Sequence, residues 1–122
     1  LYFCKFNMYH LIGLELGISV ANVGLRGEST GVSREFRADV VAVAKKNLKV
    51  GEVLDGEGGY CVAGQLRPSN ISVPMRALPL GLTGEARMIK DVSKDTILTY
   101  ADVQIDEKLP AFKLRKECET MI

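Results

Sequence analysis

Residues 46–55 read KNLKVGEVLD and residues 90–99 read KDVSKDTILT, so one pattern occurs twice with an offset of 44 positions. Only the lysine that opens each copy and the leucine at its ninth position are identical. The order of residue types is what repeats: a basic residue, an amide or acid, an aliphatic residue, a turn former and two aliphatic residues. Two copies predict one small pseudo-symmetric domain, because a solenoid needs at least about three repeats.

Each copy predicts a turn that leads into a short buried stretch. Asn47 and Asp91 can hydrogen-bond to their own backbone and start a turn. Gly51 and Asp95 occupy positions where a positive φ angle is expected, since glycine adopts it freely and aspartate tolerates it. The aliphatic pairs that follow, Val53-Leu54 and Ile97-Leu98, are expected to be buried.

Short strands are expected around the two copies. Residues 40–44 and 86–89 are apolar segments that precede the copies, and residues 60–63 form a third candidate strand. Pro68, Pro74 and Pro79 exclude long helices and central strands between the copies. Short strands separated by glycine and proline turns predict an irregular, mainly β fold.

Residues 39–106, which carry both copies, resemble the SAF domain, an antifreeze-like module with a β-clip fold. A narrower resemblance is to the C-terminal part of homoserine-dehydrogenase-like oxidoreductases, a group that includes the deoxyxylulose-phosphate-reductoisomerase-like enzymes. It is carried by YHLIGLELGISVA at residues 9–21 and LDGEGGY at residues 54–60. The resemblance implies a mainly β (α+β) chain in which a SAF/β-clip module with two pseudo-symmetric halves follows one long buried α-helix.

The same resemblance implies a division of the chain into three parts. Residues 1–38 would be a helix and linker from the body of a parent enzyme, residues 39–106 the SAF/β-clip module, and residues 107–122 a tail that forms a final strand or a short helix. NAD(P) is implied for the parent enzyme, whose Rossmann domain would lie upstream of Leu1. No cofactor is implied for this segment.

The N-terminal helix is expected to run from an N-cap at Asn7 to Arg26, with Gly27 just past its end. It is apolar almost all round, and such a helix is normally covered on most sides. A stripe of small residues would allow another backbone to approach closely: Gly13, Gly17, Ala21 and Gly24. We therefore expect this helix to pack against the rest of the parent enzyme or against identical subunits in a homo-oligomer.

Composition excludes several partner classes. The apolar run of residues 11–25 contains Glu15 and is shorter than the roughly 20 residues that span a membrane, so no membrane contact is predicted. Sixteen basic residues against 15 acidic ones leave a net charge of +1 and no basic stripe, which argues against nucleic-acid binding. Cys4, Cys61 and Cys118 are too far apart for a metal motif and are expected to be free thiols in the reducing cytoplasm.

No catalytic, cofactor-binding or metal-binding residue is predicted within this segment. His10 is the only histidine, so neither a Ser-His-Asp constellation nor a multi-histidine metal site can be argued. The resemblance would place His10 and Glu15 near the substrate pocket of the parent enzyme, and a structural role is the alternative. Residues 56–59, GEGG, lack the lysine, the hydroxyl and the helix of a phosphate-binding loop and predict a tight turn.

Basic residues supply the remaining candidates for substrate or interface contacts. Lys45, Lys46 and Lys90 would form a small anion-binding corner if the pseudo-symmetry brings the two turns together, and solvated surface charge is the alternative. In some relatives, such as sialic acid synthase, the SAF module contributes a basic residue to the substrate site of a neighbouring subunit. That resemblance implies Arg67 and Arg76 as the corresponding candidates.

We therefore expect the C-terminal SAF-domain region of an NAD(P)-dependent oxidoreductase. It would serve oligomerisation or cover an active site and would be inactive by itself. The alternative is a free-standing SAF module for ligand binding or assembly, like those of flagellar P-ring chaperones.

Overall fold

The chain divides into two units, residues 1–33 and residues 34–122. The computed structural model describes residues 11–31 and 34–121, without the side chains of Leu14 and Glu15.

The described part of the first unit contains one helix. The α-helix α1 (Ile12–Ala21) continues as a π-helical turn, η1 (Asn22–Arg26). Gly27 ends it in a left-handed conformation with φ +67°, and its N–H donates to the carbonyl oxygen of Val23 at 3.0 Å. The predicted end at Arg26 and Gly27 is thus confirmed, whereas the predicted N-cap at Asn7 lies outside the described residues.

The prediction of a long buried helix is wrong for the chain by itself. α1 contains ten described residues, and the described apolar side chains of this helix and of η1 are exposed. The exposed residues include Leu16, Ile18, Val20, Val23 and Leu25. Among the described helices, none combines the length and the apolar character that a membrane span requires.

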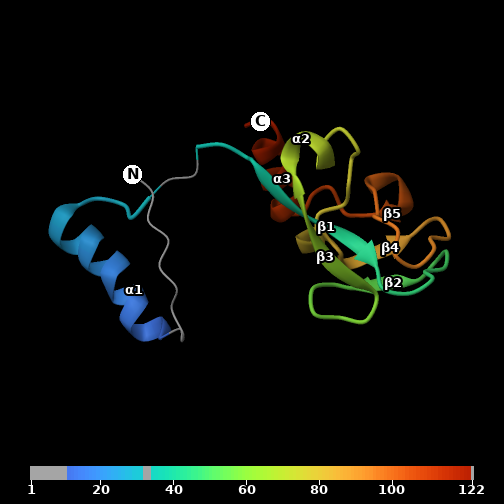
Figure 1. The fold of residues 1–122 in the computed structure, drawn as a ribbon, viewed down its shortest axis with the longest axis horizontal. Coiled ribbons are helices and arrows are strands. Elements are labelled where there is room, and N and C mark those ends of the chain that lie inside the picture. Colours follow the sequence, from blue (N-terminus) through green and yellow to red (C-terminus); the bar gives the residue numbers. More distant parts are fainter. Residues whose placement is uncertain (1–10, 32–33, 122) are drawn as a thin grey trace. The chain divides into compact units, whose positions relative to one another are not determined.

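The second unit is a small α+β domain with two antiparallel sheets (Figure 1). The first sheet pairs β1 (Ala38–Ala44) with β3 (Val62–Pro68). The predicted strand at residues 40–44 is confirmed as part of β1. The candidate strand at residues 60–63 begins only at Val62.

The second sheet has the order β2-β4-β5. Its strands are β2 (Val53–Asp55), β4 (Gly84–Met88) and β5 (Val103–Gln104). β4 contains most of the strand predicted at residues 86–89. The register between β2 and β4 shifts between Val53 and Asp55, so the sheet is irregular, as the glycine and proline pattern predicts.

The two copies of the repeat meet at the centre of this domain. Leu48 donates its N–H to the carbonyl oxygen of Val92 at 2.8 Å, and Val92 donates to that of Leu48 at 3.0 Å. These residues occupy equivalent positions in the two copies. Gly51 has φ +85° and Asp95 has φ +66°, which confirms the predicted positive φ angles.

Asn47 and Asp91 bond across the two copies and not within their own turns. The Asn47 Oδ1 atom accepts the N–H of Lys94, and the Asp91 Oδ1 atom accepts the N–H of Val50, both at 2.9 Å. Lys94 and Val50 are again equivalent positions. The sequence identifies the turn formers. The two reciprocal hydrogen bonds between the copies form only because the chain folds back on itself. A pseudo-two-fold arrangement of hydrogen bonds therefore organises the domain.

The core lies between the two sheets and is built from both copies. The equivalent residues Leu54 and Leu98 are 1% and 0% exposed, which confirms their predicted burial. Other fully buried side chains are those of Val41, Leu48, Val62, Leu78 and Met88. Two strands and two turns from distant parts of the sequence thus share one apolar interior.

Short helical segments complete the domain. α2 (Ser69–Ser72) follows β3, and two 3₁₀ turns follow at η2 (Leu80–Leu82) and η3 (Tyr100–Asp102). The tail forms the helix α3 (Pro110–Glu119), which resolves the open choice between strand and helix. Proline is favourable at the first helical position because its missing N–H would have no partner there.

Candidate functional site

A buried ion pair fixes α3 to β1. The Arg115 Nη1 and Nη2 atoms donate to the two carboxylate oxygens of Asp39 at 2.7 and 2.6 Å. The Arg115 Nε atom donates to Glu119 on the next helical turn at 2.9 Å. Asp39 is only 4% exposed, and the guanidinium also lies over the Phe36 ring at 4.7 Å. Such bidentate pairs combine charge with fixed geometry, so α3 has a defined place on the domain.

The pKa values of this pair favour the charged forms. Burial by itself would raise the pKa of Asp39, but the hydrogen bonds and the positive charge of Arg115 lower it below its ordinary value of 3.8. Burial opposes the charge of Arg115, yet the bonds to Asp39 and Glu119 raise the arginine pKa. Both groups are therefore ionised at neutral pH.

A capping box sets the position of Tyr100. The Asp102 carboxylate accepts the N–H and the hydroxyl of Thr99 at 2.8 and 2.7 Å. Tyr100 begins the 3₁₀ turn η3, and its N–H donates to the carbonyl oxygen of Arg76 at 3.0 Å. Arg76 itself has φ +53°, a left-handed conformation that is uncommon for a residue with a side chain.

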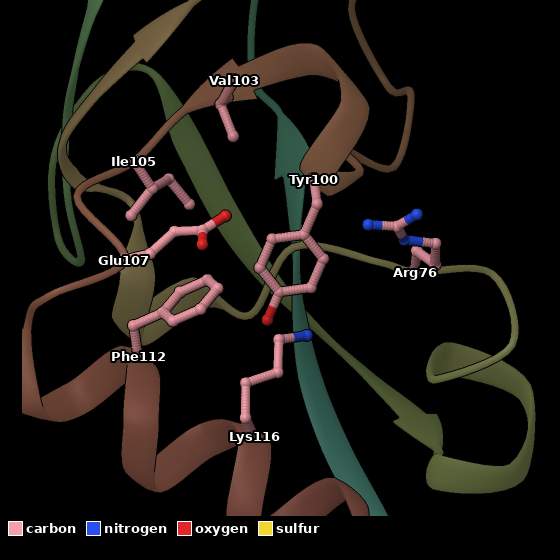
Figure 2. A pocket seen from close by; sticks show the side chains of 7 residues that line it. All are labelled: Arg76, Tyr100, Val103, Ile105, Glu107, Phe112 and Lys116. Carbon is pink, nitrogen blue, oxygen red and sulfur yellow. The ribbon is translucent and has the colours of Figure 1, made fainter.

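A cavity of about 310 Å³ lies between η3, β5 and α3. Figure 2 shows Tyr100 near its centre, with Phe112 and Glu107 on one side and Arg76 on the other. Val103, Ile105 and Lys116 complete the lining. This volume is at the lower end of the range for small-molecule sites.

Aromatic and cationic groups meet in this cavity. The Tyr100 and Phe112 rings are 6.0 Å apart in an edge-to-face arrangement. The Lys116 ammonium lies 4.2 Å from the centre of the Tyr100 ring and 2.8 Å from a carboxylate oxygen of Glu119. Burial, together with the negative charge of Glu119, raises the pKa of Tyr100 to about 12. The tyrosine hydroxyl is therefore neutral at physiological pH and can donate a hydrogen bond.

The cavity has the features of a binding site. Apolar side chains and charged groups of both signs line it, a mixture that suits a small molecule with polar or charged groups. Its lining residues do not include a nucleophile next to a general base, the arrangement that covalent catalysis needs.

The structure separates the two predicted arginine candidates. Arg76 lines the cavity, and its exposed side chain is, together with Lys116, one of the two cationic groups of the lining. Arg67 lies on β3, where its Nη2 atom donates to Gln65 at 3.0 Å. The Nε atom of Arg67 is buried and has no hydrogen-bond partner among the described residues.

The candidate lysines are held by neighbouring groups. Lys46 pairs with Glu52 at 2.5 Å, Lys90 with Asp102 at 3.9 Å, and the Lys45 ammonium donates to the carbonyl oxygen of Gly59 at 2.6 Å. The two turns do meet, as the pseudo-symmetry predicts. The anion-binding corner itself stays a prediction, and these pairings would compete with any anion there.

The remaining candidates belong to the first unit. His10 lies outside the described residues, and Glu15 is described only as part of the α1 backbone. The small-residue stripe does lie on the helix. A Cβ atom added at Gly13, Gly17 or Gly24 would meet open space, and Ala21 is exposed. A close helix contact through Gly13, Gly17, Ala21 and Gly24 stays a prediction.

The glycine turn at residues 56–59 does not fit a dinucleotide. Gly56 and Gly58 have φ angles of +75° and +77°, which confirms a tight turn. The turn encloses the carboxylate of Asp55, which accepts the N–H of Tyr60 at 2.5 Å and that of Cys61 at 3.0 Å. These backbone bonds lower the pKa of Asp55. A negative charge thus occupies the place where a pyrophosphate would need free N–H groups.

The cysteines do not form a reactive centre in the described part of the chain. Cys61 and Cys118 are free, and Cys61 is buried. Burial and the neighbouring Asp55 raise the pKa of the Cys61 thiol, so it is protonated and weakly nucleophilic at neutral pH. Cys4 lies outside the described residues. Within the ranges 11–31 and 34–121, no three His, Cys, Asp or Glu residues gather as metal ligands.

Sequence reasoning missed most of the cavity. Phe112, Arg115, Lys116 and Glu119 are spaced at helical intervals on one face of α3. Together with Pro110, this spacing could have identified the tail as a helix with an aromatic and charged inner face. No protein-family model matches this sequence, and none of the curated proteins matches it significantly.

Proposed function

We propose that this chain is the C-terminal SAF/β-clip region of an NAD(P)-dependent, homoserine-dehydrogenase-like oxidoreductase, and that it serves assembly or covers an active site without catalysing a reaction itself. The observation that carries the proposal is the set of reciprocal hydrogen bonds between the two copies of the repeat. Leu48 and Val92 pair with each other, and each copy's Asn or Asp accepts an N–H of the other copy. Such an exchange of hydrogen bonds is what we expect of a β-clip with two pseudo-symmetric halves.

A further observation supports a role in assembly. The helix α1 and the turn η1 expose apolar side chains on their described surface, such as Ile18 at 70% and Leu25 at 86%, and burying them would be favourable. In the second unit, the ion pair of Arg115 with Asp39 is the most buried and stabilises the fold. The chain thus offers an apolar surface for association.

The covering role would be carried by Arg76. Its side chain lies at the rim of the cavity beside Tyr100 and Lys116, and cations at such a rim suit an anionic group of a substrate held by the parent enzyme or a neighbouring subunit. NAD(P) would bind elsewhere in the parent, because the glycine turn around Asp55 does not fit it.

The test is the coding region upstream of Leu1 and the longer protein that it encodes. We expect a strand followed by Gly-x-Gly-x-x-Gly and a helix, and NADPH binding by the longer protein but not by these 122 residues. In that protein, Arg76→Ala should raise KM with little change in kcat, whereas the exposed control Lys113→Ala should change neither. A start codon close to Leu1, or a longer protein without dinucleotide binding, would reject the oxidoreductase parent.

The alternative is a free-standing ligand-binding or assembly module, which the cavity in Figure 2 favours. Its lining of apolar and charged side chains could hold a small polar ligand without any other domain. This alternative predicts a start codon close to Leu1. It also predicts that the 122-residue chain is monodisperse.

A further inference from the structure

The strand β3 has an open edge. Ser69 donates its N–H to Arg37, and Cys61 accepts the N–H of Lys45, so the odd-numbered residues of this segment face β1. In an antiparallel pair the intervening residues direct their backbone groups to the other side. The N–H and C=O groups of Val62, Gly64 and Leu66 therefore point away from β1, and no strand of the described chain pairs with them.

This edge has few of the features that usually prevent strand association. The four residues at positions 63–66 are exposed, the pairing with β1 runs without a bulge, and the only proline ends the strand at Pro68. β3 contains no lysine. An undistorted edge whose only charge and only proline lie at its end, at Arg67 and Pro68, is a template for another strand. A two-stranded sheet also gains stability when further strands are added.

Apolar side chains lie along the same edge. Leu66 is 70% exposed, and Val40, directly opposite on β1, is 45% exposed. Gly64 has no room for a side chain within the fold, because a Cβ atom there would lie 2.7 Å from Val40 Cγ1 and 2.9 Å from Leu80 Cδ2. The edge thus combines free backbone groups with an apolar strip.

We propose that β3 pairs antiparallel with β3 of a second copy of this chain, centred on Gly64. Val62 of one copy would then face Leu66 of the other, so all outward N–H and C=O groups between these residues find partners. Because a two-fold axis matches a strand with itself, a single sequence satisfies both sides of the interface. The result is a four-stranded sheet with the order β1-β3-β3-β1.

Charge favours this direction of pairing. Arg67 is the only charged residue of β3, and antiparallel pairing places the two arginines at opposite ends of the interface. Each then lies near the end of the partner strand that follows the acidic turn with Asp55 and Glu57. Parallel pairing would place the two arginines side by side, where like charges repel.

The inference rests on the assembly role in the proposed function and does not require the oxidoreductase parent. Its test uses the 122-residue chain with a reductant present, so that no disulfide contributes. Sedimentation across a dilution series gives the dimer dissociation constant, and amide hydrogen exchange by NMR reports on single residues. The amides of Val62, Gly64 and Leu66 should become protected with concentration, while those of Ala63 and Gln65 should be protected throughout.

Two variants address the edge without disturbing the fold. Leu66→Pro removes an outward N–H together with the leucine side chain and fixes φ near the values of an extended strand, and Leu66→Lys adds a charge to an exposed position. Each should weaken dimerisation by about tenfold or more, which corresponds to the loss of one or two hydrogen bonds or an added repulsion. Leu114→Lys, at a similarly exposed position of α3, is the matched control and should leave the dimer intact.

Protection of the Ala63 and Gln65 amides shows whether each variant is folded. If the Ala63 and Gln65 amides lose their protection in Leu66→Pro, that variant is not folded, and the dissociation constant of Leu66→Lys then tests the interface. A chain that stays monomeric with rapidly exchanging outward amides overturns the proposal. So does a dimer that survives both Leu66 variants, because its interface must then lie elsewhere, for example on α1. Slow outward amides in a monomer would mean that another segment covers the edge, and would also reject the proposal.

Discussion

The two copies of the repeat share one backbone arrangement, but the segments that follow them differ. After the first copy, Asp55 is enclosed by a glycine turn and accepts two backbone N–H groups. After the second copy, the equivalent Thr99 begins a capping box that leads into η3 and the cavity. Symmetry thus builds the core of the domain, and the departure from symmetry builds the candidate site.

Removal of Arg115 should have the largest effect, and it acts on the side of the second copy. Arg115→Leu leaves the Asp39 carboxylate buried without its partner, which should reduce the free energy of unfolding by about 3–5 kcal/mol. Arg115→Lys keeps the charge but loses the bidentate bonds and should cost less. Chemical denaturation of both variants measures the difference. Equal stability of Arg115→Leu and the unmodified chain would show that α3 does not depend on this pair.

The same pair predicts a pH dependence. The pKa of Asp39 is lowered in the folded state, so its ionised form contributes stability above the ordinary value of 3.8, and this contribution is lost as the pH falls through the folded-state pKa. In Arg115→Leu, burial without the arginine should raise that pKa instead. The difference in free energy of unfolding between the two proteins should therefore shrink as the pH falls from neutral into acid. A difference that is as large in acid as at neutral pH would contradict this assignment.

The shared centre is tested by Leu48→Ala. Leu48 is 0% exposed and lies where the two copies meet, so truncation should cost about 2–5 kcal/mol. Val92→Ala, at the equivalent position, removes a smaller side chain that is 9% exposed and should cost less. Thermal or urea unfolding compares the two. A larger loss of free energy of unfolding for Val92→Ala than for Leu48→Ala would mean that Leu48 is not the more important of the two residues in the shared core.

The turn after the first copy is tested by Gly59→Ala. A Cβ atom at this position would lie 2.2 Å from the Asp55 Cγ atom, so the carboxylate must give up its bonds to Tyr60 and Cys61 or the turn must shift. We expect a loss of about 1–3 kcal/mol. Gly58→Ala is a useful comparison, because it meets strain from φ +77° but no neighbouring atom within 4 Å. Denaturant unfolding should rank Gly59→Ala as the less stable of the two.

The turn after the second copy should show the smallest effect. Thr99→Ala removes a capping hydroxyl and should cost about 1 kcal/mol. Because Tyr100 stays bonded to Arg76 through its backbone, the fold should persist while the cavity loosens. Melting temperature gives the stability change, and the line widths of the Tyr100 and Phe112 ring signals report the loosening. Sharp, unshifted ring signals in the variant would contradict a positioning role for the cap.

Local residue types were sufficient to predict much of the repeat. Gly51 and Asp95 were identified because few residues accept a positive φ, and Leu54 and Leu98 because aliphatic pairs after a turn are usually buried. The hydrogen bond from the Lys94 N–H to Asn47 was not predictable, because it joins residues that are far apart in the sequence.

The helix and the cavity show where local patterns fail. The apolar pattern of residues 11–25 indicates a helix that needs cover, but it does not say what covers it, and the described apolar side chains of this helix are exposed. The cavity depends on Arg115 reaching Asp39 across 76 positions of sequence, a contact that fixes α3 and thereby places Phe112 and Lys116 beside Tyr100. Local periodicity carries no information about such a contact.

The reciprocal pairing of Leu48 and Val92 is the central claim, and scalar coupling across hydrogen bonds tests it most directly. A long-range NMR experiment that correlates amide nitrogens with carbonyl carbons should show two cross-peaks, from the Leu48 nitrogen to the Val92 carbonyl and from the Val92 nitrogen to the Leu48 carbonyl. Both peaks together would establish that the two copies interlock. The absence of both from an otherwise complete spectrum of the folded chain would contradict the pseudo-two-fold arrangement.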